Sequence, residues 1–166
     1  MTSLILRNTE RGYIVEETSG KVVAVSGGFD PVHAGHLSYI KNAMKLGDRV
    51  IVILSRNDQL EAKKGYFFMD YFERKVILEA IVGSNGVVVE NIDENITSCQ
   101  SLRLYKPHIF AKGGDTWDKE NLPEQVVCEE LGIKVVFGVG GFNKAQSSSK
   151  LVEKAVESHR NLTSQK

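Results

Sequence analysis

The chain has 166 residues, of which 42% are hydrophobic, and its 21 basic and 21 acidic side chains give a formal net charge of zero at pH 7. This length is enough for one domain with a full hydrophobic core and too short for two comparable domains. The sequence contains no block of like charges, so we expect no bulk binding of nucleic acid or of a membrane surface.

The N-terminal segment, residues 1–20, carries one short apolar cluster at residues 4–6, which is too short for a signal-peptide core or a membrane span. We therefore expect a cytoplasmic protein without a membrane partner. Residues 1–20 are expected to be an N-terminal extension that forms an extra hairpin or an oligomer contact. Cys99 and Cys128 lie apart in segments with helical character, which indicates neither a disulfide framework nor a CxxC metal site.

From residue 21 onward, short β-rich runs alternate with segments of helical periodicity. The strand candidates are nearly continuously apolar, as in strands buried on both faces; they are residues 22–26, 49–55, 86–90, 108–111 and 133–138. The helix candidates are residues 36–46, 71–82, about 95–105, a segment after Asn121 with Pro123 in its first turn, and about 148–158.

This alternation predicts an α/β fold: one domain over residues 21–158 built on a doubly wound, Rossmann-like sheet of five parallel strands. Helices are expected on both faces, joined to the strands by right-handed crossovers. We expect the strand order 3-2-1-4-5, because the first crossover runs to one side of the first strand and the later ones run to the other. Residues 159–166 are expected to be a frayed tail.

The most informative loop is SGGFDPVHAGH, residues 26–36, between the first strong strand and the first helix. In an open parallel sheet, ligands bind beyond the carboxyl ends of the strands, where the strand order reverses. Gly27 and Gly28 allow the backbone to approach a phosphate group closely, and Pro31 stiffens the turn. The helix that follows presents N–H groups and the positive end of its dipole, so the loop predicts an anion site.

His33 and His36 are three residues apart at the entry of that helix, so both rings can face one bound group. Imidazoles donate hydrogen bonds to phosphate oxygens and, when protonated, add positive charge where a phosphoryl-transfer transition state gains negative charge. Two alternatives stay open. The histidines could be ordinary polar loop residues, or they could hold a divalent metal together with Asp30.

Other loops at the same sheet edge carry related chemistry. The fourth strand is followed by AKGGDTW, residues 111–117, with paired glycines beside a lysine and an aspartate. The fifth is followed by residues 138–154, in which three serines fall at the start of the last helix and could hold phosphate oxygens. Lys64 follows the second strand. Each feature alone is common on surfaces and at helix caps, but their convergence on one edge favours a phosphate-rich ligand.

The stretch GGFDPVHAGHLSYIKNAMKLGDRVIVILS resembles the HxGH nucleotidyltransferases of the cytidylyltransferase-like superfamily, whose signature is a G-x-F-D-x-x-H-x-G-H loop after the first strand. The resemblance extends from about residue 22 to residue 154. Members join a nucleoside triphosphate to a phosphorylated small molecule and release pyrophosphate. The resemblance therefore implies these two substrates as partners and Mg²⁺ as the cofactor accompanying the nucleotide; we also expect a homodimer or higher homo-oligomer.

Matching positions imply roles for single residues. His33 and His36 would bind and stabilise the α-phosphate during in-line attack, and Lys64, the third catalytic residue, would meet the triphosphate. Asp30, Lys64 and Arg74 are implied on the acceptor side. The expected nucleotide-binding residues are Gly27, Gly28, Phe29, Asp30, Gly35, Lys112, Gly113, Gly114, Asp115, Ser147, Ser148 and Ser149.

Within the superfamily, SYIKNAMKLGDRVIV and AKGGD resemble heptose 1-phosphate adenylyltransferases, whereas KKGYFFMDYFERKVILEAI also resembles glycerol-3-phosphate cytidylyltransferases. Gly28 stands where many members have a Thr or Ser that touches the acceptor phosphate. The serines at 147–149 match a terminal loop that holds the β- and γ-phosphates, but the arginine that often precedes them is absent, and Lys144 is the candidate substitute.

The leading hypothesis is a nucleotidyltransferase that uses ATP or CTP, with a sugar phosphate such as heptose 1-phosphate as the favoured acceptor. The alternatives are a glycerol-3-phosphate-type cytidylyltransferase and a regulatory module that binds nucleotide without turnover. A dinucleotide-dependent oxidoreductase is disfavoured, because the first loop lacks G-x-G-x-x-G and no acidic residue ends the second strand.

Overall fold

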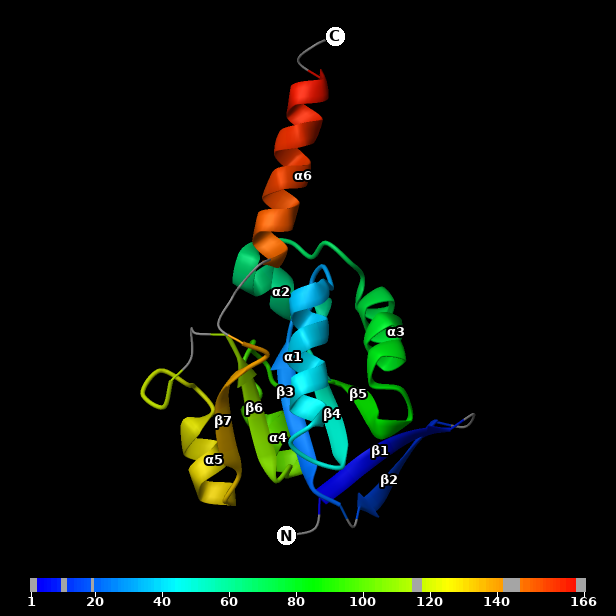
Figure 1. The fold of residues 1–166 in the computed structure, drawn as a ribbon, viewed down its shortest axis with the longest axis vertical. Coiled ribbons are helices and arrows are strands. Elements are labelled where there is room, and N and C mark those ends of the chain that lie inside the picture. The colour runs from blue at the N-terminus through cyan, green and yellow to red at the C-terminus, as the bar shows by residue number, and fades with distance from the viewer. Residues whose placement is uncertain (1–2, 10–11, 19, 115–117, 142–146, 164–166) are drawn as a thin grey trace.

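A parallel sheet forms the centre of the computed structural model, which describes residues 3–9, 12–18, 20–114, 118–141 and 147–163 (Figure 1). Its strands are β3 (Val22–Gly27), β4 (Arg49–Leu54), β5 (Gly86–Glu90), β6 (Ile109–Gly113) and β7 (Lys134–Val139). Their order across the sheet is β5-β4-β3-β6-β7, and all neighbouring pairs are parallel. Counted along the chain this is 3-2-1-4-5, so the predicted topology is confirmed.

Helices cover both faces of this sheet, as predicted. The helices of the described residues are α1 (Ala34–Met44), α2 (Asn57–Lys64), α3 (Tyr71–Val82), α4 (Cys99–Tyr105), α5 (Gln125–Leu131) and α6 (Ser148–Thr163), of which α6 extends beyond the sheet, with a short 3-10 turn at Gly83–Asn85. In the part of the chain that the structure describes, no helix is both long and apolar enough to cross a bilayer.

Alternate residues of the central strand β3 enter two separate hydrophobic cores. Val23 and Val25 pack in a core with residues of α1 and α3, whereas Val22 and Ala24 pack in a second core with residues of α4 and α5. All four are fully buried, because successive side chains of a strand point to opposite faces and both faces are covered. This double burial explains why the strand sequences are almost continuously apolar.

Helix α2 was not among the predicted elements. Its sequence, NDQLEAKK, is short and polar, and only Gln59 and Leu60 are buried. A helix that buries two residues has no visible apolar periodicity. It ends at Gly65, whose φ of +84° is left-handed and suits glycine.

Two further parts lie beside the central layers. β1 (Ser3–Thr9) and β2 (Gly12–Thr18) form an antiparallel hairpin, one of the two possibilities expected for residues 1–20. Helix α6 extends away from the carboxyl edge of the sheet (Figure 1) and continues to Thr163, past the end expected near Ser158 and into the expected tail. Residues 159–163 contain neither glycine nor proline to stop it.

Candidate active site

A cavity of about 510 Å³ lies at the carboxyl ends of β3, β6 and β7, beside the first half of α1. Its lining comprises residues 26–29, 33–36, Ser38, Tyr39, 112–114, 139–141, Ser147 and Ser148. The fold thus brings together the loop at residues 26–36, here called the histidine loop, the glycine pair at the end of β6 and two of the three serines, which are far apart in the sequence.

His33 and His36 cap helix α1. His33 is the N-cap, and its Nδ1 accepts a hydrogen bond from the backbone N–H of Gly35 at 3.1 Å. His36 is three residues on, and its Nδ1 accepts a hydrogen bond from the backbone N–H of His33 at 3.3 Å. The two residues therefore form a capping box in which imidazoles replace the usual hydroxyl and carboxyl groups.

The arrangement of the two histidines favours their neutral forms. Their rings stack with centroids 3.8 Å apart. Burial lowers the pKa of His33, and burial together with the charge of His33 lowers the pKa of His36 to about 3. Because both Nδ1 atoms accept hydrogen bonds, the neutral rings carry their protons on Nε2. In this form the pair offers two neutral N–H donors to the cavity.

Asp30 does not line the cavity. Its buried carboxylate accepts hydrogen bonds from the backbone N–H groups of Phe68 at 2.7 Å and Met69 at 2.6 Å and from Lys64 Nζ at 2.8 Å. Its oxygens are thus engaged by the segment between α2 and α3. Among the described residues there is no cluster of three potential metal ligands. In this structure Asp30, His33 and His36 do not come together as such a cluster.

Lys64, expected at the triphosphate, also lies outside the cavity lining. Its ammonium group bonds to the Asp30 carboxylate and to the Asp30 carbonyl oxygen at 3.2 Å, and it sits 4.5 Å from the centroid of the Tyr66 ring. The side chain remains 23% exposed, so solvent reaches the pair. In this structure the Lys64 ammonium group is directed at Asp30 and not at the cavity lining.

Arg74 is fully buried and holds the histidine loop by hydrogen bonds. Its guanidinium donates to the carbonyl oxygens of Gly28 at 2.7 Å, Ser55 at 2.8 Å and Met69 at 3.0 Å, and to Asn57 Oδ1 at 2.7 Å. With all its groups engaged in this way, Arg74 does not face a ligand. The implied contact with substrate phosphate is replaced by a structural role, because the helix turn at Arg74 points inward.

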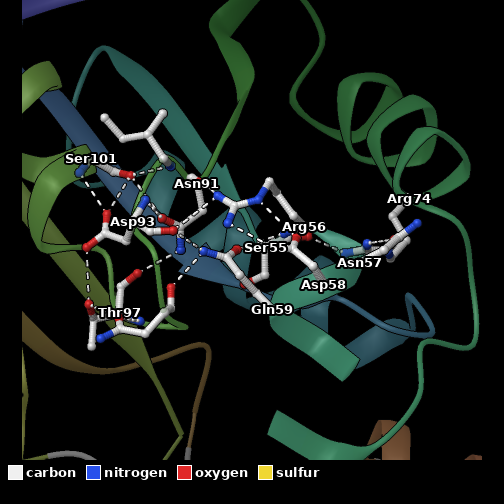
Figure 2. A network of polar contacts seen from close by, with 12 residues as sticks. Ser55, Arg56, Asn57, Asp58, Gln59, Arg74, Asn91, Asp93, Thr97 and Ser101 are labelled. Carbon is white, nitrogen blue, oxygen red and sulfur yellow. Dashed lines mark hydrogen bonds and ion pairs between the residues drawn. The ribbon is translucent and has the colours of Figure 1, made fainter. Parts of the chain in front are cut away.

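Figure 2 shows that Arg74 is one end of a longer polar network at the carboxyl ends of β4 and β5. The network continues through Ser55, Asn57, Arg56, Asp58 and Gln59 to Asn91, Asp93, Thr97 and Ser101. Asp93 alone accepts from two backbone N–H groups and two hydroxyls. These bonds hold the loops after β4 and β5 in fixed positions beside the histidine loop.

Lys112 is the cation that does line the cavity. It is only 7% exposed, its ammonium group lies 4.9 Å from the centroid of the Phe110 ring, and burial lowers its pKa. A partly desolvated cation interacts strongly with an anion that enters the same low-dielectric space. Lys112 was expected among the nucleotide-binding residues, and the structure places it at the cavity.

The loop after β7 approaches helix α1 very closely at Gly140. A Cβ atom at this position would lie 2.8 Å from Tyr39 Cα, and the φ of Gly140 is +94°, which disfavours any other residue. Ser38 Oγ donates to the Gly140 carbonyl oxygen at 3.3 Å. Glycine therefore allows this loop to form one wall of the cavity directly against α1.

The serines begin helix α6 at the cavity rim. Ser148 Oγ donates to the carbonyl oxygen of Pro31 at 3.0 Å, which ties α6 to the histidine loop, and Ser147 Oγ accepts from the backbone N–H of Lys150. Ser147 and Ser148 line the cavity, whereas Ser149 is exposed and does not. Asp115 and Lys144, named in the sequence analysis, lie outside the described residues.

Tyr39 is a lining residue that the sequence analysis missed. Its hydroxyl donates to the carbonyl oxygen of Ala111 at 2.6 Å, and burial raises its pKa. It lies one helical turn after His36, so the spacing could have placed it on the same side of α1.

Comparisons with known proteins show which family and which solved structures this chain resembles. A family model described as cytidylyltransferase-like matches residues 24–154. An FAD synthase of Pyrococcus horikoshii is 31% identical over 138 residues, which are 81% of this chain and 92% of that protein. The bifunctional protein HldE of Actinobacillus succinogenes is 30% identical over 162 residues, which are 93% of this chain. The chain spans only 31% of that HldE protein.

Solved structures show the same fold. The chain matches the Thermotoga maritima protein TmcAL, crystallised with alpha-thio ATP, with a TM-score of 0.63 and 15% identity over 84% of this chain and 51% of the other. It matches a lipopolysaccharide core biosynthesis protein from Thermoplasma volcanium with a TM-score of 0.58 and 22% identity, over 75% of this chain and all of the other. At these identities the likeness concerns the fold alone.

Proposed function

Since this chain belongs to the cytidylyltransferase-like family of nucleotidyltransferases, we propose that it transfers an adenylyl group from ATP to the phosphate of a small phosphorylated acceptor. In this reaction an acceptor phosphate oxygen attacks the α-phosphorus of ATP. A new phosphorus–oxygen bond forms, the bond to the β-phosphate oxygen breaks, and pyrophosphate leaves with the bonding electrons.

Two groups of relatives favour ATP over CTP. FAD synthases of about 30% identity cover nearly the same length as this chain, and FAD contains an adenylyl group. The HldE relatives agree with the heptose 1-phosphate adenylyltransferase resemblance noted in the sequence. Heptose 1-phosphate therefore remains the favoured acceptor, flavin mononucleotide joins it as a candidate, and glycerol 3-phosphate with CTP is the alternative.

The paired histidines are the single observation on which this proposal depends most. Their Nε2–H groups would donate to the α-phosphate oxygens that gain negative charge as the acceptor attacks. Neutral donors suit this task, because they need no proton uptake and their positions are fixed by the Nδ1 hydrogen bonds of the capping box. The N-terminus of α1 adds the positive end of its dipole at the same place.

Other lining groups would bind the rest of the triphosphate. Ser147 and Ser148, at the start of α6, present hydroxyls for the β- and γ-phosphates, and Lys112 supplies a positive charge within the cavity. Lys64 would join them when the entering phosphates draw it away from Asp30. The acceptor would approach from the side of Asp30 and Lys64, opposite the departing pyrophosphate, as in-line displacement requires.

Mg²⁺ would enter with the nucleotide. None of the described lining residues is an aspartate or a glutamate, so the chain's described part offers no carboxylate cage. Mg²⁺ commonly binds through substrate phosphates and keeps several waters, which suits such a cavity. When bound, it would neutralise phosphate charge during the displacement.

The test is a pyrophosphate-release assay of the purified chain with Mg²⁺. Each of the four nucleoside triphosphates is combined with heptose 1-phosphate, flavin mononucleotide and glycerol 3-phosphate in turn. We expect release with ATP and one phosphorylated acceptor, and none when the acceptor is omitted. Nucleotide binding by calorimetry without release for any pair would favour the regulatory module and contradict the proposal.

A further inference from the structure

Glu124, the residue before helix α5, is a buried carboxylate to which the reaction has so far given no task. It is only 3% exposed. Its Oε1 accepts a hydrogen bond from the backbone N–H of Ser98 at 2.9 Å, whereas its Oε2 is buried and has no hydrogen-bond partner among the described residues. A carboxylate removed from water is costly unless a positive charge lies near it. A neighbouring cation is therefore expected.

Lys112 lies on the same side of the sheet as Glu124. Lys112 and Phe110 are two residues apart on β6, so their side chains leave the same face, and the Lys112 ammonium group lies 4.9 Å from the centroid of the Phe110 ring. Phe110 packs in the second core with Leu122 and Cys128, which come two residues before and four residues after Glu124. The buried cation and the buried carboxylate thus belong to one cluster of groups.

The charges around Lys112 act in opposite directions. Burial lowers the pKa of Lys112, the charge of Glu124 raises it, and the positive charge of Lys63 lowers it further. The remaining group that faces Lys112 is Cys128, and burial together with the charge of Glu124 raises the pKa of that thiol to about 12. Cys128 therefore stays a neutral thiol below this pH. Glu124 is left as the charge that opposes loss of the Lys112 proton.

We infer that Glu124 is a positioning residue for nucleotide binding, whose carboxylate keeps Lys112 charged and in place at the cavity. Glu124 does not line the cavity and acts through Lys112, which does. The inference rests on the proposed function, which brings a triphosphate to Lys112. Without the carboxylate, the buried ammonium group loses its proton more readily, and a neutral amine attracts phosphate less. The affinity for ATP should therefore depend on Glu124 most strongly at basic pH.

The experiment is calorimetric titration of the full chain with ATP and Mg²⁺ from about pH 7 to pH 10. For the wild type, the affinity should fall at basic pH as Lys112 loses its proton. E124Q has nearly the same shape, and its amide oxygen can still accept the Ser98 N–H bond. Its decline should begin about one pH unit lower, so that on this limb it binds ATP up to about tenfold more weakly than the wild type.

Two further variants separate the charge of Glu124 from its packing. E129Q makes the same substitution at an exposed residue of α5 and should follow the wild-type profile. E124D keeps the negative charge but shortens the reach to Ser98, and its decline should stay close to that of the wild type. A merely structural role would instead make E124D at least as weak as E124Q. Circular dichroism checks that each variant is folded.

Lys112→Arg identifies the titrating group. A guanidinium stays charged throughout this pH range, so K112R should lack the basic decline, and E124Q should cause no shift when it is added to K112R. Lys63 keeps its charge-bearing side chain in every variant. A shift that disappears in the K112R background therefore belongs to Lys112.

Four outcomes would overturn the inference. E124Q could decline at the same pH as the wild type, E124D could shift as far as E124Q, or the shift could persist in K112R. An E124Q variant without the wild-type circular-dichroism spectrum would also overturn it, because Glu124 would then be a structural residue. These outcomes leave the proposed function intact. A wild type that binds no ATP at any pH would contradict the proposed function itself, and this inference with it.

Discussion

His33 uses its two ring nitrogens for different tasks. Nδ1 caps helix α1, whereas Nε2–H is the donor assigned to the α-phosphate. Asparagine is a good N-cap whose side-chain oxygen can replace Nδ1, but it offers no donor at the Nε2 position. His33→Asn should therefore keep the stability of the wild type within about 0.5 kcal/mol and lower kcat by about 10²–10³-fold.

Urea denaturation and the pyrophosphate assay together check this prediction. A variant that retains more than half of the wild-type kcat would show that His33 only caps the helix. His36→Asn is the companion variant, because its side-chain oxygen can accept the bond from the His33 N–H, and its kcat should fall to a similar extent.

His36 also gives the stability a definite pH dependence. Its pKa is about 3 in the folded chain and near 6.5 when unfolded, so below pH 6.5 the unfolded state binds more protons. The contribution of His36 to the free energy of unfolding is present above pH 6.5 and is lost progressively as pH falls towards 3. Between pH 6.5 and 5.5 the loss should be about 1 kcal/mol.

Urea denaturation at pH 7.5, 6.5 and 5.5 measures this slope. His36→Asn removes the titrating group. The variant should therefore lose about 1 kcal/mol less unfolding free energy between pH 6.5 and 5.5 than the wild type. An unchanged slope in the variant would mean that His36 titrates near its usual pKa in the folded chain, and the neutral-donor mechanism would lose its support.

At the scale of elements, the packing of Gly140, the residue after β7, on α1 forms one wall of the cavity. Gly140→Ala adds a Cβ 2.8 Å from Tyr39 Cα as well as an unfavourable positive φ, so the loop must move away from α1. Gly132→Ala is the control: its φ of +67° is also left-handed, but nothing lies within 4 Å of the added Cβ. The control should cost about 1–2 kcal/mol, the price of a left-handed residue.

We expect Gly140→Ala to cost clearly more than the control in thermal unfolding and, unlike the control, to raise the KM for ATP. Equal effects of the two substitutions on stability and on KM would show that the close approach to Tyr39 has no part in forming the cavity.

At the scale of the whole molecule, nucleotide and Mg²⁺ should act together. The described residues include no metal-binding cluster, so Mg²⁺ alone should leave the melting temperature unchanged. ATP with Mg²⁺ at about 100 times its Kd should stabilise the folded chain by about 2.7 kcal/mol, because the ligand binds only the folded state. Differential scanning fluorimetry measures the melting temperature under both conditions. Stabilisation by Mg²⁺ without nucleotide would reveal a protein metal site.

The sequence was sufficient for the topology of the central sheet and for most of the cavity. Five apolar strands with intervening helices leave few arrangements once crossovers are right-handed, so the order 3-2-1-4-5 followed from local patterns. The glycine and histidine loop could be recognised because its residues are adjacent in the chain. Helix α2 could not be recognised in the sequence, because it buries too few side chains to produce a periodic pattern.

The roles of Asp30, Lys64 and Arg74 were decided only by the tertiary structure. In the sequence Asp30 lies in the loop at residues 26–36, Lys64 and Arg74 lie far beyond it, and nothing local distinguishes a ligand contact from a buried support. The fold brings the loop between α2 and α3 against the histidine loop. There Asp30 and Arg74 form hydrogen bonds with backbone groups of both segments. A buried charge must find such partners, and which partners it finds depends on contacts between segments distant in the chain.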